Sequence, residues 1–166
     1  MHMKALKYIV TFFVGTIALS ACKPDFKEFE YIQEKSIENL SGQWKGVSVI
    51  QKDLDAERKK FPYQTLNITE FMKFNEFTLV LNADKGAPTT FTINYGNSIP
   101  LFKFNTGKWE VNNNKQVSAI NLINATDTVT LNLSAYSNLK ENKATFNYTK
   151  SLSGKPVINY ELTLTK

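Results

Sequence analysis

The sequence predicts an all-β protein, namely an antiparallel up-and-down barrel of about eight to ten strands behind a short helix, with a β-sandwich as the alternative. From Gly42 onward apolar and polar residues alternate, in segments rich in Thr, Val, Ile, Phe and Tyr. Alternation of this kind places one face of a strand in a core and the other in water. Turn-forming residues interrupt the pattern roughly every eight to twelve positions, and such short turns join neighbouring antiparallel strands.

The elements follow from the same pattern, read in chain order. Ile37 and Leu40 have helical spacing and predict a short helix before the first strand. Strands are expected between breaks such as Asp84-Lys85-Gly86 and Ser153-Gly154-Lys155-Pro156. The expected strands are 43–51, 64–72, 76–82, 89–95, 99–104, 107–111, 116–123, 127–134, 143–150 and 156–165.

The N-terminal residues carry the pattern of an export signal. Lys4 and Lys7 precede an apolar run, 8–19, which is shorter than the ~20 residues that span a bilayer. The following Leu19-Ser20-Ala21-Cys22 resembles the lipobox of bacterial lipoproteins, and Cys22 is the only cysteine. The resemblance implies removal of residues 1–21 and lipidation of Cys22. The alternative is an ordinary secretory signal followed by an incidental cysteine.

Lipidation at Cys22 would define both the organisation and the location of the protein. The expected parts are a signal peptide (1–21), a lipid-anchored tether (22–36) and a barrel domain (37–166). Two or three acyl chains anchor a protein lastingly, so the expected partner is a membrane. We expect the outer membrane, with the periplasmic and the surface-exposed orientations both open.

Composition narrows the range of functions. Removal of residues 1–21 leaves 145 of the 166 residues, enough for one domain, and lowers the net charge from +5 to +3. Arg58 is the only arginine and the lysines are scattered, which argues against nucleic acid as a partner. His2 is the only histidine, so the mature chain lacks Ser–His and Cys–His nucleophile pairs and zinc sites built on His or Cys. We therefore expect no catalytic residue, no metal and no cofactor.

Two Gly-x-Trp motifs stand at the starts of expected strands. Gly42-Gln43-Trp44 opens the first strand, and Gly107-Lys108-Trp109 opens a strand in the middle of the domain. Together with the lipobox they resemble lipocalin-like lipoproteins of unknown function from Bacteroidota. The resemblance implies a barrel in which the glycine permits a tight entry and the tryptophan plugs the closed end. Lipocalins usually stack a late arginine over the first tryptophan, and here only a late lysine could take that place.

Ligand contacts are predicted from residues expected to face the interior. Glu70 shares the inward parity of Leu66 and Ile68 if its strand is regular, and a strand end is the alternative. A second acid cannot be placed beside Glu70, so a carboxylate-dependent hydrolase is the least favoured function. Four aromatic residues are candidates for lining an apolar cavity, with core packing as the usual role: Phe91, Tyr95, Tyr148 and Tyr160.

Two further segments invite a functional interpretation. Residues 52–62 form the first long connection, in which Leu54, Arg58 and Phe61 could share one side of a short helix that acts either as a lid or as a capped surface helix. Asp127-Thr128-Val129 resembles the sequence that Bacteroidota O-glycosylate on exported proteins, which implies a sugar on Thr128; an ordinary outward strand residue is the alternative.

These observations favour a lipid-anchored barrel of the cell envelope that binds a small apolar or amphipathic ligand without catalysis. The alternative is a filled barrel that serves as an accessory subunit of an outer-membrane or surface complex, with an envelope protein as its partner. An unbroken core together with an exposed apolar patch would favour the alternative.

Overall fold

The structure is a computed structural model that describes residues 36–113, 117–134, 139 and 141–166. The expected signal peptide, Cys22 and almost all of the tether lie outside the described residues.

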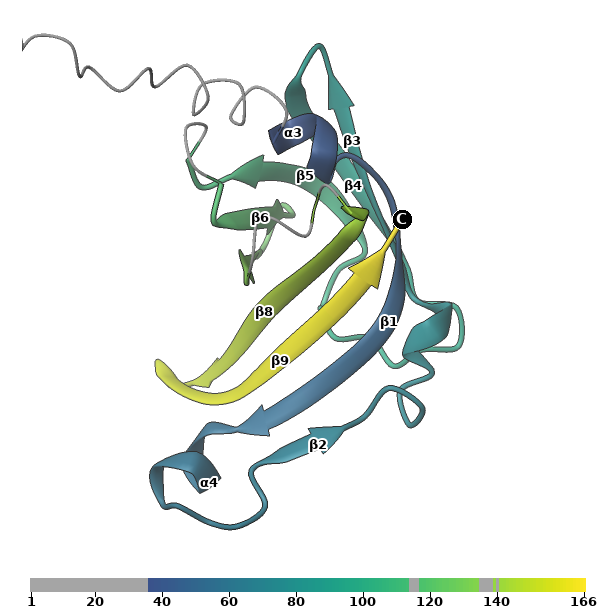
Figure 1. Cartoon of the computed structure of the whole chain (residues 1–166). Coiled ribbons are helices and arrows are strands. Elements are labelled where there is room, and N and C mark those ends of the chain that lie inside the picture. The colour runs from purple at the N-terminus through teal and green to yellow at the C-terminus, as the bar shows by residue number, and fades with distance from the viewer. Residues whose placement is uncertain (1–35, 114–116, 135–138, 140) are drawn as a thin grey trace, which may run out of the picture. The chain divides into compact units, whose positions relative to one another are not determined.

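The described residues form a closed antiparallel barrel with one additional strand (Figure 1). Eight strands, β1 and β3 to β9, follow one another in sequence order, and β1 closes the barrel by pairing with β9, while β2 pairs with β1 alone. The predicted up-and-down barrel is thus confirmed. The elements are α3 (Ser36–Leu40), β1 (Gly42–Asp53), α4 (Leu54–Arg58), β2 (Thr65–Asn67), a 3₁₀ turn η1 (Phe74–Glu76), β3 (Thr78–Asp84), β4 (Ala87–Asn94), β5 (Thr106–Val111), β6 (Ala119–Ile123), β7 (Thr128–Leu133), β8 (Lys143–Leu152) and β9 (Lys155–Thr165).

β1 organises the barrel because it pairs with three strands. Its first residues, Gly42 to Lys45, pair with β3, and its last residues pair with β2 on that same edge, while β9 runs along the opposite edge. The β1–β9 register shifts between Gly46 and Ser48, where the strand carries a bulge. A Cβ at Gly46 would lie 2.1 Å from the carbonyl oxygen of Phe74, so the backbone of η1 packs directly on this glycine.

The strand expected over 64–72 is wrong beyond Asn67. The Asn67 side chain accepts hydrogen bonds from the backbone N–H and the hydroxyl of Thr69, at 3.0 and 2.6 Å. These bonds close a local turn that competes with strand pairing. The chain then turns again, with the N–H of Met72 donating to the carbonyl of Ile68 at 2.8 Å.

The strand expected over 99–104 is also wrong. Residues 95–105 form the connection between β4 and β5. Within it, the consecutive residues Leu101 and Phe102 are both buried. Consecutive strand residues point to opposite faces, so a strand with one wet face could not bury both side chains. The N–H of Ile99 donates instead to the carbonyl of Met72, at 3.2 Å, which ties this connection to the turn before β3.

Both tryptophans are buried, and each binds the backbone close to the point where α3 leads into β1 and β1 pairs with β3. The indole N–H of Trp44 donates to the carbonyl of Leu40 at 2.7 Å, and that of Trp109 donates to the carbonyl of Asn82 at 2.6 Å. Gly42 has a φ of +117°, which L side chains rarely adopt, and it makes the tight passage from α3 into β1. A lysine, Lys166, places its ammonium over the Trp44 ring.

Candidate functional site

The barrel wall opens between β7 and β8. These strands pair through Asn132 with Asn147 and Leu133 with Phe146. Continued register would bring Thr130 opposite Thr149 and Thr128 opposite Ser151, but neither pair forms. β8 keeps its pairing with β9 down to Leu152, so its other edge is left facing the gap.

A cleft of about 650 Å³ lies at this gap. Residues of β7, of the turn before it, of β8 and of the β4–β5 connection line it: Pro100, Leu101, Phe102, Lys103, Asp127, Thr128, Val129, Thr130, Asn132, Tyr148, Thr149, Lys150 and Ser151. Its size is within the range of about 300–1,000 Å³ that is usual for small-molecule sites.

The β4–β5 connection supplies the apolar floor of the cleft. The ring of Phe102 meets that of Tyr148 edge to face, with centroids 5.0 Å apart, and Tyr148 in turn stacks on Tyr160 at 6.1 Å. The hydroxyl of Tyr95 lies 3.4 Å from the carbonyls of Phe102 and Phe104, a long contact that runs along the same connection. Of the four aromatic residues predicted to contact a ligand, Tyr148 alone is among the residues that line the cleft. Tyr95 lies behind it next to the backbone of Phe102, and Tyr160 lies next to Tyr148.

The strand register places Tyr148 at one end of a row of paired residues. Gln51 pairs with both Leu66 and Tyr160, and Tyr160 pairs with Tyr148. Directly paired residues lie side by side on one face of a sheet, so these four residues form a row across β2, β1, β9 and β8. Leu66 is exposed, which makes the outer end of the row accessible from solvent.

The rim of the cleft is polar and mostly hydroxyl-bearing. Thr128, Thr130, Thr149 and Ser151 stand on the two facing strand edges. Lys103 lies 3.8 Å from Asp127, and the Lys103 side chain is almost fully exposed, so the pair is weakly held. An apolar floor below hydroxyls and two cations, Lys103 and Lys150, suits a molecule with an apolar part and a polar or anionic head group.

The phenol of Tyr148 in the cleft and those of Tyr95 and Tyr160 behind it stay neutral at physiological pH. Burial raises the pKa of Tyr95, of Tyr148 and of Tyr160 above the ordinary tyrosine value, and the carboxylate of Asp127 adds to the rise at Tyr148. A neutral phenol both donates and accepts one hydrogen bond, so Tyr148 can orient a polar group that enters the cleft.

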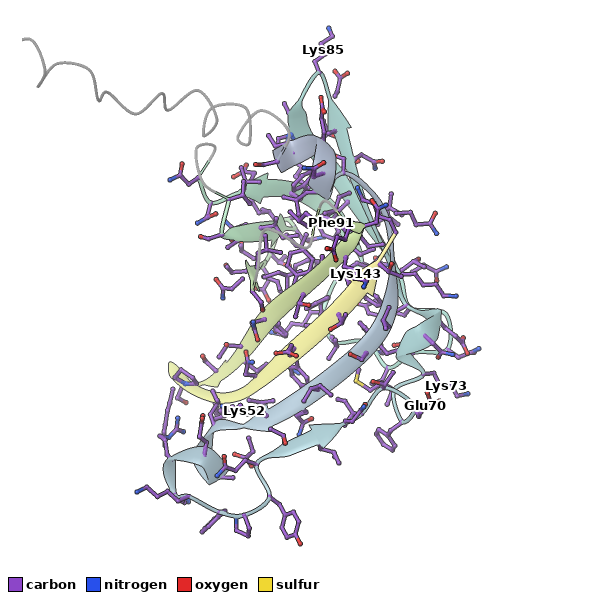
Figure 2. All side chains as sticks on the ribbon, in the orientation of Figure 1. Lys52, Glu70, Lys73, Lys85, Phe91 and Lys143 are labelled. Atoms are coloured by element: carbon purple, nitrogen blue, oxygen red, sulfur yellow. The ribbon has the colours of Figure 1, made fainter. Side chains whose placement is uncertain are left out.

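The other predicted site residues lie elsewhere. Phe91 is inside the barrel, where its ring covers Gly107, its strand partner (Figure 2). Glu70 is exposed in the turn after β2, beside Lys73, because the strand that would have pointed it inward ends at Asn67 (Figure 2). Thr128 is exposed at the edge of the cleft, where its N–H is held by the Asp127 carboxylate at 2.8 Å.

Sequence reasoning missed the connection that forms the floor and the two lysines at the rim. The signal for the connection is the adjacent apolar pair Leu101-Phe102 directly after Pro100. Proline cannot donate a hydrogen bond to a strand ladder, and a strand cannot bury two consecutive side chains on one face.

The first long connection contains α4, a helix that is fastened to the barrel. The Asp53 carboxylate caps it by accepting the N–H groups of Asp55 and Ala56, each at 2.9 Å. Asp55 pairs with Arg58 and, at 3.1 Å, with Lys155 at the start of β9. These bonds favour the capped surface helix over the lid.

In the described part of the chain, no three His, Cys, Asp or Glu side chains lie close enough together to hold a metal ion. None of the helices described there has the length and apolar character needed to cross a membrane. Comparison of the chain with models of known protein families finds no match, and comparison with curated proteins finds none either.

Proposed function

We propose that this chain is a lipid-anchored cell-envelope protein that binds a small amphipathic molecule, without catalysis, in the cleft between β7 and β8. The observation that carries the proposal is the cleft itself, in which the buried Leu101 and Phe102 form a floor below a rim of hydroxyls and lysines. The apolar part of the ligand would lie against Phe102 and Tyr148, and its head group would meet Lys103, Lys150 and the threonines.

The anchor rests on the run Leu19-Ser20-Ala21-Cys22 and on its resemblance to a lipobox. An outer-membrane anchor would hold the barrel where amphipathic molecules are abundant. The non-catalytic role rests on composition, since the only histidine and the only cysteine precede Lys23. The phenol of Tyr148 would then position a ligand rather than transfer its proton.

Native mass spectrometry tests this function on the full chain, released from its own membranes in lipid nanodiscs. We expect a barrel that retains one small molecule, and reversal of both rim charges, Lys103→Glu with Lys150→Glu, should greatly lower the retained fraction. Lys85→Glu, at the opposite end of the barrel (Figure 2), is the matched control and should change nothing. A bare protein mass, or equal retention in both variants, would overturn the proposal.

A second function is favoured by the filled interior. The large side chains inside the barrel are fully buried, among them Trp44, Phe77, Phe91 and Phe146. We infer that, if the cleft stays empty, the chain is an accessory subunit of an envelope complex. Chemical cross-linking in intact cells would then recover one defined protein partner, whereas a ligand-binding barrel would yield none in stoichiometric amount.

A further inference from the structure

The connection between α4 and β2 exposes aromatic side chains beside lysines. Residues 59–63, Lys59-Lys60-Phe61-Pro62-Tyr63, are called the basic–aromatic loop below. Phe61 is 53% exposed and Tyr63 is 90% exposed. Large apolar side chains with so little contact to their own fold often mark an interaction surface.

The backbone of this loop is held in place although its side chains are not. The N–H of Phe61 donates to the carbonyl of Ala56 at 2.9 Å, and the Gln64 side chain donates to the carbonyl of Phe61 at 2.8 Å. The N–H of Asp53 donates to the carbonyl of Gln64 at 2.8 Å, which ties the far end of the loop to β1. The rings are thus presented outward by a braced loop, which lowers the conformational entropy lost on docking.

The acids nearest to the loop are already engaged. Glu57 pairs with Lys52, while Asp55 pairs with Arg58 and Lys155. Among the described residues neither Lys59 nor Lys60 has an ion-pair partner, and the Lys59 ammonium lies 5.9 Å from the centre of the Phe61 ring. The loop therefore offers two uncompensated cations next to two exposed rings.

The β8–β9 hairpin adds to the same end of the barrel. The Lys155 to Asp55 ion pair fastens it to α4, and the Arg58 guanidinium also donates to the carbonyl of Pro156 at 3.2 Å. Leu152 at the hairpin is 70% exposed. Figure 1 shows α4 and this hairpin together at the end of the barrel away from α3.

We propose that the basic–aromatic loop docks this end of the barrel onto an anionic lipid surface. Phe61 and Tyr63 would enter the headgroup region, and Lys59 and Lys60 would contact lipid phosphates. A lipid surface fits better than a protein partner because the centres of protein interfaces are depleted in lysine, whereas interfacial membrane-binding segments combine lysines with aromatic rings. The proposal is independent of the ligand in the cleft and of the lipid on Cys22.

Site-specific photo-crosslinking of the full chain in bacterial cells tests the docking. The photoreactive amino acid p-benzoylphenylalanine is placed at position 63 or, as the control, at position 85 in the β3–β4 turn at the opposite end (Figure 2). We expect phospholipid adducts at position 63 and few at position 85. Equal yields at both positions, no lipid adduct at position 63, or adducts there mainly with protein would overturn the proposal.

Charge reversal separates docking from mere proximity to a membrane. With the photoreactive group at position 63, Lys60→Glu should lower the lipid-adduct yield at least about fivefold, since one lysine near an anionic surface is worth ~1 kcal/mol and the new carboxylate is repelled as well. Lys85→Glu is the matched control and should leave the yield unchanged. An unchanged yield in Lys60→Glu, measured in protein that stays folded by circular dichroism, would contradict lipid docking by the loop.

Discussion

The ammonium of Lys166 lies 4.8 Å from the centre of the Trp44 ring and donates to the carbonyl of Asn39 at 2.7 Å. The contact joins the residue after β9 to the helix and the tryptophan that open the domain, and so closes the α3 end of the barrel. Burial lowers the pKa of Lys166, but the ring and the carbonyl both favour its charged form. The residue that stands over the first tryptophan is thus a late lysine.

Lys166→Ala should therefore destabilise the barrel by roughly 1 kcal/mol, because it removes the cation–π contact and an exposed hydrogen bond to the Asn39 carbonyl. Lys166→Arg should restore most of the loss, since a guanidinium stacks on an indole and still donates. Urea unfolding followed by tryptophan fluorescence measures both changes. Equal stability of Lys166→Ala and the wild type would show that the contact contributes nothing.

Gly107→Ala should be severely destabilising. A Cβ at this position would lie 2.1 Å from the carbonyl oxygen of Ile123 and 2.9 Å from the ring of Phe91, and neither the paired strand nor the core ring can retreat cheaply. We expect a loss of about 3 kcal/mol or more, at the upper end for overpacking.

Gly86→Ala is the comparison, because a Cβ there meets nothing within 4 Å and costs only the strain of a φ of +75°. That strain should amount to about 1 kcal/mol. Thermal unfolding measures the stability of both variants. Equal losses in the two would contradict the close packing at Gly107.

The stability of the barrel should fall in alkaline solution as its buried phenols ionise. Burial raises the pKa values of Tyr148 and Tyr160 in the folded chain, so the unfolded chain releases these protons first. Their contribution to stability is complete below about pH 10 and is lost as the pH rises through the folded pKa values. Tyr148→Phe should flatten this fall in the free energy of unfolding between pH 9 and about pH 11. A fall as steep as in the wild type would show that ionisation of Tyr148 does not cause the loss of stability.

Glu70→Gln should leave ligand retention and stability unchanged, because Glu70 is exposed in a turn outside the cleft. Native mass spectrometry and urea unfolding of the variant measure the two quantities. Reduced retention would show that Glu70 contacts the ligand, as an inward strand position predicts.

Alternation predicted the strands because it is a local signal. Val129 and Leu131 on β7, like Leu162 and Leu164 on β9, are buried while their neighbours face outward, as the pattern indicated. Segment 99–104 was misassigned because its burial depends on tertiary contacts of Phe102 with Tyr148, which local periodicity does not contain. The inward position predicted for Glu70 is wrong for a local reason. The hydrogen bonds between the Asn67 side chain and Thr69 end the strand before it reaches Glu70.

The cleft could not be predicted from the sequence. It exists because β7 and β8, over the residues that the structure describes, pair only near Asn132 and Leu133 and then separate, and nothing in the alternation of either strand marks where pairing stops. Tyr148 and Tyr160 were candidates as inward aromatics, but only the register places them in one row with Gln51. The hydroxyls of the rim look like ordinary outward strand residues in the sequence.

Photoaffinity mapping tests ligand binding in the cleft most directly. Cells that express the full chain are fed a fatty acid carrying a diazirine, irradiated, and the labelled peptides are identified by mass spectrometry. We predict labels concentrated on residues 100–103, 128–132 and 148–151, the three segments that line the cleft, and their loss in Lys103→Glu with Lys150→Glu. Labels spread evenly over the barrel, or confined to other segments, would contradict a binding site between β7 and β8.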